Sequence, residues 1–232
     1  MTQVAFITGA SRGIGRAIAL RAAELGYNLF LLARNAAALA EVVEQCKGRD
    51  VAVECLVGEL ADEKYMDKAL QSALGSFGAI EVLINNAGAS SRQAVQDADL
   101  NAWRDVLDVN FNAVMYLSRQ VLPSMIERKS GAVVNISSIS GRNTHAEGAI
   151  YCASKHALNG FSGCMYEDVR EHGIKVSTIM PGFVDTGMTS TLDLNSNHMI
   201  QPNDVADAVQ YVLSASSTCC PTEIILRPQA RP

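Results

Sequence analysis

The stretch VAFITGASRGIG, residues 4–15, decides the fold, because an apolar run passes directly into a glycine-rich turn. The run predicts a strand, and after the turn apolar residues recur at helical spacing, at Ile14, Ile18, Ala22 and Leu25. Gly26 is expected to end that helix. Glycine allows a tight turn and lets an anion approach the free N–H groups at a helix N-terminus. The stretch therefore predicts a strand, a phosphate-binding turn and a helix, in that order.

Six further apolar runs follow, separated by stretches of helical character. With the first, the seven runs lie at residues 4–8, 28–33, 51–57, 82–85, 132–137, 175–180 and 223–226. Short runs alternating with helices are typical of a parallel sheet covered on both faces. We therefore predict an α/β fold. It would be a single Rossmann-type domain over residues 1–232, with a doubly wound parallel sheet of about seven strands and helices on both faces. For the last helix, at 204–215, Asn203 is the expected N-cap.

Composition excludes several classes of protein. The chain has 232 residues, 48% hydrophobic and 19% charged, which argues against global disorder. A net charge of −5 without a basic run argues against a nucleic-acid partner. The six cysteines form no C-x-x-C pair, so we expect no metal site and a cytoplasmic, reducing compartment. Without an apolar run of about 18 residues, we expect no membrane span, and we expect no signal peptide.

The residue that follows the second predicted strand bears on cofactor choice. An acidic side chain there would bind the ribose 2′-hydroxyl of NAD, but the sequence has Ala33-Arg34. A guanidinium pairs well with a 2′-phosphate, and Arg12 in the glycine-rich turn adds a second positive charge. We therefore favour NADP(H) over NAD. The alternative is that both arginines are solvated surface residues.

A tyrosine and a lysine form the predicted catalytic pair. Tyr151 and Lys155 are four residues apart, which places them on one face of a helix. Because a nearby ammonium favours the phenolate, we expect Lys155 to lower the pKa of Tyr151. Such a pair suits proton transfer in a carbonyl/alcohol interconversion. Ser138 follows the run at 132–137, at the strand end where parallel sheets place their active sites, and its hydroxyl can hold a substrate oxygen.

These motifs resemble those of the classical short-chain dehydrogenase/reductase family. The matching elements run in order from Val4 to about Thr186: the glycine-rich turn at 8–15, Asn85-Asn86-Ala87-Gly88, Asn110, Ser138, Tyr151-x3-Lys155 and Pro181-Gly182. The C-terminal stretch is similar to the compact bacterial carbonyl-reductase and 3-hydroxy-acid-dehydrogenase-like branch.

The resemblance implies four catalytic residues. Ser138 would orient the substrate carbonyl, and Tyr151 would donate the proton. Lys155 would bind the nicotinamide ribose, and Asn110 would hold a water that links Lys155 to solvent. The cofactor-binding residues would be Gly9, Ser11, Arg12, Gly13, Ile14, Gly15, Arg34, Glu59, Leu60, Asn86, Ala87, Gly88, Tyr151, Lys155, Pro181, Gly182, Val184 and Thr186.

Two positions depart from the family pattern. Glu59-Leu60 stands where the family usually has Asp before an aliphatic residue, which would alter the contact with the adenine. The usual Gly-Gly near the C-terminus is absent, which puts the subunit contact of the last helix and strand in doubt. The resemblance implies a homotetramer, or alternatively a homodimer, formed through helices at 103–129 and 151–172. Apolar residues left over on those helices would then be covered.

Three segments, at 89–95, 138–149 and 185–201, are expected to line the substrate pocket, the last as a substrate loop. Candidate substrate-binding residues are Ser138, Tyr151, Arg142, His145 and Met188. The apolar residues of the loop favour a neutral, partly apolar small molecule, whereas Arg142 facing the pocket would favour a 3-oxo acid. The predicted function is NADPH-dependent reduction of a ketone or aldehyde to an alcohol.

Other functions stay open at this point. Reduction of a 3-oxoacyl thioester on a carrier protein would need a basic docking surface, for which Arg128, Lys129 and Arg170 are candidates. A 3-hydroxy acid dehydrogenase is a related alternative. A non-catalytic NADP(H) sensor would use the same fold, although it need not keep the catalytic residues. A dehydratase, epimerase or lyase would hold nicotinamide tightly and show no net cofactor consumption.

Overall fold

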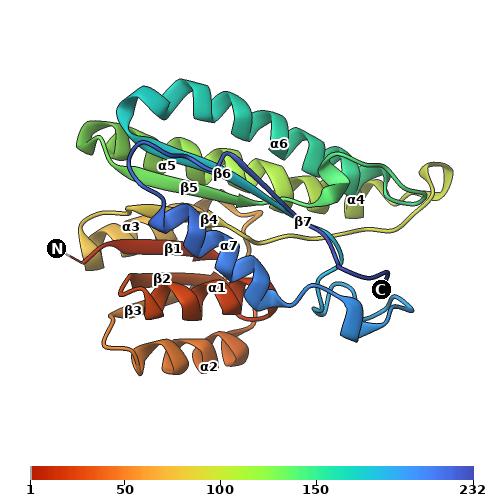
Figure 1. The fold of residues 1–232 in the computed structure, drawn as a ribbon, viewed down its shortest axis with the longest axis horizontal. Helices are drawn as coiled ribbons and strands as arrows, with labels where there is room; N and C mark the ends of the chain where they lie inside the picture. The colour runs from red at the N-terminus through yellow and green to blue at the C-terminus, as the bar shows by residue number, and fades with distance from the viewer. Residues whose placement is uncertain (1) are drawn as a thin grey trace.

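The computed structural model describes residues 2–232, and its centre is a seven-stranded parallel sheet (Figure 1). In sheet order, the strands are β3 (Val53–Val57), β2 (Asn28–Ala33), β1 (Val4–Thr8), β4 (Val82–Asn85), β5 (Gly131–Ile136), β6 (Ile174–Pro181) and β7 (Glu223–Leu226). Every neighbouring pair is parallel. The chain runs outward from β1 to β3 and then returns to place β4 on the other side of β1, so the predicted doubly wound fold is confirmed.

Helices cover both faces of the sheet (Figure 1). One face packs against α1 (Gly13–Glu24), α2 (Ala36–Lys47) and α7 (Pro202–Ser214). The other face packs against α3 (Glu63–Phe77), α5 (Ala113–Arg128) and α6 (Ala149–Val169). The short helix α4 (Leu100–Leu107) continues through a π-helical segment, Asp108–Asn112, into α5. Within residues 2–232, none of the helices has both the length and the hydropathy needed to cross a bilayer.

The strands are apolar because two helical layers bury them. Every residue of β1 and of β4 is buried, and alternate side chains enter the two opposite cores. In β1, Ile7 joins the core beneath α1 and α7, whereas Phe6 joins the other core and stacks on Phe30 at 5.4 Å between ring centroids. The edge strands β3 and β7 are only partly buried. The run predicted at 51–57 begins as a strand only at Val53, and just before it the Ala52 N–H donates to the side-chain Oδ1 of Asn28 at 2.9 Å instead of to a backbone carbonyl.

The C-terminal end of α1 and the N-terminal end of α7 can be compared with the helix ends predicted from the sequence. Helix α1 ends at Glu24, and Gly26 has a φ of +83°, as expected for the glycine that stops a helix. The predicted N-cap of α7 is wrong, because this helix already begins at Pro202 and its N-cap is Gln201. The Gln201 N–H donates to Asp204 Oδ2 at 2.8 Å, and a proline in the first turn needs no hydrogen-bond acceptor.

Candidate active site

The candidate site lies at the carboxyl edge of the sheet. There β1 ends at Thr8, β4 at Asn85 and β5 at Ile136, and because these strands are adjacent and parallel their ends lie side by side. The glycine-rich turn leaves β1, and the segments that hold Asn86 and Ser138 leave β4 and β5. Three predicted motifs that are far apart in the sequence therefore meet at one edge.

The turn after β1 requires glycine at specific positions. Gly9 has a φ of +67°, and a Cβ there would lie 2.9 Å from the Cα of Ala87. At Gly15 a Cβ would lie 2.1 Å from the carbonyl oxygen of Gly9. Arg12 precedes the first turn of α1, where no side chain caps the helix and no residue is acidic. The start of α1 is therefore a backbone cradle suited to an anion.

Two side chains fix this cradle to the segment after β4. The Thr8 Oγ1 accepts the N–H groups of Asn86 and Ala87, both at 3.0 Å. The Asn86 Nδ2 donates to the carbonyl oxygens of Thr8 and Gly9 at 2.9 and 3.2 Å. Asn86 therefore supports the turn directly, and Thr8 is a supporting residue that our sequence reasoning did not identify.

Two arginines give this edge positive charge. Arg34 directly follows β2, and its Nη1 lies 3.7 Å from Oε2 of Glu59. Arg12 reaches the opposite side of the turn, where a Cβ added at Gly187 would lie 3.3 Å from its Nη1. A glycine-bounded cradle at a helix N-terminus suits the pyrophosphate of a nicotinamide dinucleotide. No cluster of metal-ligating side chains occurs in residues 2–232.

Helix α6 carries the predicted catalytic pair on one face, one turn apart. The Lys155 ammonium lies 5.9 Å from the ring centroid of Tyr151 and donates to the carbonyl oxygen of Ile136 at 2.9 Å. Lys155 is buried, and burial lowers its pKa to about 8. Ser138 lies in the turn after β5, where its Oγ accepts the N–H of Ser140 at 3.1 Å.

The expected decrease in the pKa of Tyr151 is wrong. Burial raises the pKa of this phenol, and a hydrogen bond with Ser138 only partly opposes the increase. The spacing of Tyr151 and Lys155 placed an ammonium nearby but contained no information about the desolvation of the phenolate, which has the larger effect here. The Ser138 hydroxyl does lie beside the phenol, which is the position that its predicted role requires.

Asn110 lies buried in the π-helical segment and connects two parts of the site. Its Oδ1 accepts the Ala89 N–H at 2.8 Å, and its Nδ2 donates to the Ala89 carbonyl at 2.9 Å. The same Nδ2 donates to the Oγ of Ser154 at 3.0 Å, and Ser154 in turn donates to the carbonyl of Tyr151 at 2.8 Å. Asn110 thus links the segment after β4 to α6, while its predicted role in a water relay stays a prediction.

Ser154 is the residue of this network that sequence reasoning missed. It is fully buried, and it stands three residues after Tyr151 and directly before Lys155. A serine within a helix can bond back to a carbonyl of the preceding turn, which is a weak signal because most helical serines face solvent. Its second partner, Asn110, comes from a distant segment and has no local signature.

The predicted substrate loop, 185–201, lies next to the glycine-rich turn. It begins and ends in a parallel bridge between Val184 and Ile200, and the Asp185 N–H donates to the Ile200 carbonyl at 2.9 Å. Thr186 lies against the glycine-rich turn, since a Cβ at Gly13 would lie 3.1 Å from its methyl group. The loop therefore contacts the turn predicted to bind the cofactor. Pro181 and Gly182 lie just before it, at the end of β6.

The remaining substrate candidates have different surroundings. Met188 is 44% exposed, and a Cβ at Gly88 would lie 3.9 Å from its Cε, so it reaches the cofactor side. His145 is exposed, with its Nδ1 3.0 Å from the Ala146 carbonyl oxygen. Arg142 forms an ion pair with Glu223, the first residue of β7. Because both side chains of this pair are about half exposed, the pair can open at little cost and does not decide whether the substrate is acidic.

The candidate docking surface for a carrier protein lies at the wrong edge. Arg128 and Lys129 come directly before β5, and Arg170 comes shortly before β6. In a parallel sheet these positions belong to the amino edge, opposite the carboxyl edge that holds Ser138. Arg170 also pairs with Glu167. Within one chain these residues therefore lie away from the pocket, and their role in docking a carrier protein stays a prediction.

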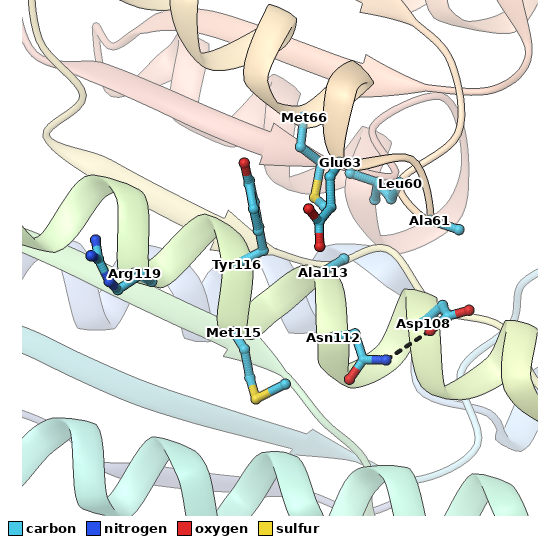
Figure 2. A pocket seen from close by; sticks show the side chains of 10 residues that line it. All are labelled: Leu60, Ala61, Glu63, Met66, Asp108, Asn112, Ala113, Met115, Tyr116 and Arg119. Atoms are coloured by element: carbon cyan, nitrogen blue, oxygen red, sulfur yellow. Dashed lines mark hydrogen bonds between the residues drawn. The ribbon is translucent and has the colours of Figure 1, made fainter.

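A cavity of about 410 Å³ lies apart from the catalytic residues, between the start of α3 and the π-helical segment with α5 (Figure 2). It is lined by Leu60, Ala61, Glu63, Met66, Asp108, Asn112, Ala113, Met115, Tyr116 and Arg119. Asn112 donates to Asp108 at 2.7 Å across one wall (Figure 2). Of the predicted cofactor residues only Leu60 contributes, and the cavity is not the catalytic site.

Known proteins match this chain over nearly its whole length. The family model for short chain dehydrogenases matches residues 3–197. An uncharacterised oxidoreductase of Staphylococcus saprophyticus is 32% identical over 227 residues, which is 97% of each chain. A metagenomic short-chain oxidoreductase solved in complex with NADP has a TM-score of 0.87 and 32% identity, covering 99% of this chain and 98% of its own.

Actinorhodin polyketide ketoreductase, solved as a variant with NADPH, has a TM-score of 0.90 and 25% identity, covering 98% of this chain and 96% of its own. The family resemblance of the motifs, the doubly wound fold and these matches agree. The chain belongs to the short-chain dehydrogenase/reductase family of oxidoreductases.

Proposed function

We propose that the protein is an NADPH-dependent reductase that converts a ketone or aldehyde carbonyl to an alcohol. The observation that carries the proposal is the meeting of Ser138, Tyr151 and Lys155 at the same sheet edge as the glycine-rich turn. Such a constellation places a proton donor beside a cradle for a nicotinamide dinucleotide. When bound there, the reduced nicotinamide supplies a hydride to the carbonyl carbon.

The protein's own residues handle the substrate oxygen and the proton. Ser138 donates a hydrogen bond to the carbonyl oxygen and holds it toward Tyr151. The raised pKa of Tyr151 keeps the phenol protonated at neutral pH, so it gives its proton to that oxygen as negative charge develops. The phenolate that remains is stabilised by the Lys155 ammonium and regains a proton from solvent. Asn110 bonds both to Ala89, in the segment after β4, and to Ser154 on α6, and so keeps these two parts of the site in place during this exchange.

Charge at the edge supports NADPH over NADH. Arg34 stands after β2, where a carboxylate would repel a 2′-phosphate, and Arg12 precedes α1. Two similar solved structures contain NADP and NADPH, respectively. Arg34 would then recognise the 2′-phosphate, and the N-terminus of α1 would recognise the pyrophosphate. Arg12 would join Arg34 at the 2′-phosphate by turning away from Gly187.

The loops favour a neutral carbonyl compound of small to medium size. Met188 contributes an apolar side chain next to Gly88. Actinorhodin polyketide ketoreductase, a structural neighbour, is by its name a reductase of ketones. We therefore place ketones and aldehydes ahead of 3-oxo acids as substrates.

The test is NADPH consumption by the purified protein against a panel of carbonyl compounds. The panel holds an aromatic diketone, a simple aldehyde, a 3-oxo ester, a 3-oxo acid and a 3-oxoacyl thioester. NADH and the Tyr151→Phe variant run in parallel. We expect turnover with NADPH, much slower turnover with NADH, and a decrease of about a thousandfold or more in the variant.

Other outcomes identify other functions. Tight NADPH binding by wild type and by Tyr151→Phe, without turnover of any panel member, would support a sensor instead of a reductase. Conversion of a substrate without net cofactor consumption would support a dehydratase, epimerase or lyase. Equal rates with NADH and NADPH would contradict the assignment of Arg12 and Arg34 to a 2′-phosphate.

A further inference from the structure

The ends of β2 and β3 bring two opposite charges together. Ala33 is in register with Val57, and the Gly58 N–H donates to the Ala33 carbonyl at 3.1 Å. Arg34 and Glu59 therefore leave neighbouring strand ends at the same edge. The Nη1 of Arg34 lies 3.7 Å from Oε2 of Glu59, with 69% and 59% of the two side chains exposed.

Water surrounds this ion pair, so it can open at little cost. Exposed pairs of this kind contribute about 0–1 kcal/mol, because solvent screens the charges and long side chains lose freedom. A phosphate dianion that offers two oxygens to the same guanidinium can therefore displace the carboxylate. The carboxylate of Glu59 nevertheless stays anchored to the strand end, a few ångströms from the displaced position, and its charge repels the phosphate.

We propose that Glu59 is a specificity-determining residue that limits the preference for a 2′-phosphorylated cofactor. It does so by competing for the Arg34 guanidinium and by repelling the phosphate. The inference rests on the proposed function, in which Arg34 binds that phosphate. It assigns Glu59 a role beyond the adenine contact that the family resemblance implies.

The direct test measures binding of two cofactor fragments that differ only in the 2′-phosphate. Adenosine 2′,5′-bisphosphate and adenosine 5′-monophosphate are titrated into the full chain by calorimetry, for wild type and for Glu59→Gln. Loss of the carboxylate is expected to tighten binding of the bisphosphate by roughly threefold to tenfold. Binding of the monophosphate is expected to change by less than about twofold, because it lacks the 2′-phosphate and the glutamine of Glu59→Gln keeps an oxygen that can accept a hydrogen bond from the adenine amino group.

Two further variants separate this role from a general effect of charge. Glu54→Gln removes the same charge from β3 at an exposed position about 16 Å back along the strand, and we expect it to leave both affinities as they are. Arg34→Ala removes the guanidinium for which the Glu59 carboxylate and the 2′-phosphate compete. In the Arg34→Ala background the effect of Glu59→Gln on the bisphosphate should shrink, which a double-mutant cycle measures as coupling.

Each alternative has a distinct result. Weaker binding of the bisphosphate by Glu59→Gln would show that Glu59 holds Arg34 in place, and this would overturn the inference. Equal changes for both fragments would assign Glu59 to the adenine alone and overturn it too. If wild type prefers the bisphosphate and Glu59→Gln leaves the ratio unchanged, only the inference fails. If no variant binds either fragment, the cofactor assignment under the proposed function fails with it.

Discussion

At the scale of single residues, the site depends on an ammonium group that the fold holds among buried atoms. Lys155 is 4% exposed, and its Nζ donates to the carbonyl oxygen of Ile136. Burial lowers its pKa from the ordinary value of 10.5 to about 8. The charge that we propose stabilises the Tyr151 phenolate is therefore lost at a pH at which exposed lysines keep their protons.

The first prediction concerns the pH dependence of reduction. We expect the rate constant of reduction to fall as the pH rises through about 8, because Lys155 loses its charge there while Tyr151 still holds its proton. Steady-state rates at saturating NADPH and carbonyl substrate, measured from about pH 6 to about pH 10, check this. A rate that stays constant until the phenol itself ionises, above its ordinary pKa of 10.0, would show that the ammonium charge is dispensable.

The second prediction concerns stability. Because the folded-state pKa of Lys155 lies below the unfolded value, the unfolded chain binds more protons between pH 8 and 10.5, and the free energy of unfolding rises with pH in that window. Below pH 8 the full burial cost is present. Lys155→Met should therefore be more stable than wild type at neutral pH, by on the order of 2 kcal/mol, although inactive.

Urea unfolding of both proteins at neutral pH and near pH 10 measures this difference. The difference should shrink at the higher pH, where wild type no longer carries a buried charge. A variant that is less stable at neutral pH, or a difference that does not change with pH, would mean that packing around the lysine stem outweighs desolvation.

Sequence reasoning identified these residues but could not predict their ionisation. The four-residue spacing of Tyr151 and Lys155 predicted a shared helix face, because a helix repeats every 3.6 residues. The surroundings that shift both pKa values come from other segments, such as Ile136 at the end of β5 and Ser138 after it. Spacing along one helix carries no information about such partners.

At the scale of elements, the strands were predictable and the π-helical segment was not. Apolar runs bounded by polar residues predicted all seven strands, four with identical ends and three with ends that differ by one or two residues. The segment Asp108–Asn112 contains neither glycine nor proline that would announce an irregular helix. Hydrogen bonds from Asn110 to Ala89 and Ser154 hold it, and both partners lie on elements distant in sequence.

The third prediction tests whether this segment positions the catalytic helix. Ser154→Ala removes the hydroxyl that joins Asn110 to the carbonyl of Tyr151. We expect a loss of about 1–2 kcal/mol in the free energy of unfolding, as for other buried hydrogen bonds. We also expect kcat to fall by about tenfold with little change in the KM for NADPH. The reason is that the Tyr151 phenol would move relative to the substrate, whereas the glycine-rich turn predicted to bind the cofactor would keep its position.

A matched control stands two turns further along α6. Ser162 is also buried, donating to the Leu158 carbonyl at 2.6 Å and accepting from Asn135 at 2.8 Å. Ser162→Ala should lose a similar amount of stability without the selective fall in kcat. If the two variants lower kcat equally, Ser154 supports the fold and does not position Tyr151.

At the scale of the whole molecule, exposed apolar side chains lie where the sequence did not place them. We expected leftover apolar residues on the helices at 103–129 and 151–172. Among residues 2–232, none of the large apolar side chains that are exposed belongs to α5 or α6. Tyr211 on α7 is 57% exposed and Ile225 on β7 is 41% exposed. Which face of a helix stays uncovered depends on the packing of all elements, so helical periodicity alone does not predict it.

The fourth prediction is the oligomeric state. Strand β7 is an edge of the sheet, with one side of its backbone unpaired and Ile225 exposed along it. We expect a homotetramer, or a homodimer, with α7 and β7 in one subunit contact despite the missing Gly-Gly. Sedimentation at about micromolar concentration should show one of these species, and Tyr211→Glu or Ile225→Glu should shift the mass toward a smaller one.

Leu74→Glu is the control for these charge substitutions. Leu74 is 44% exposed on α3, so the variant adds the same charge to an apolar side chain outside α7, β7 and the helices at 103–129 and 151–172. It should leave the sedimentation coefficient unchanged. A monomer in the wild type would contradict both oligomeric states. If the assembly persists in both Tyr211→Glu and Ile225→Glu, the subunit contact lies elsewhere. A carboxylate buried without a partner in the contact would weaken association, because removing its charge from water costs several kcal/mol.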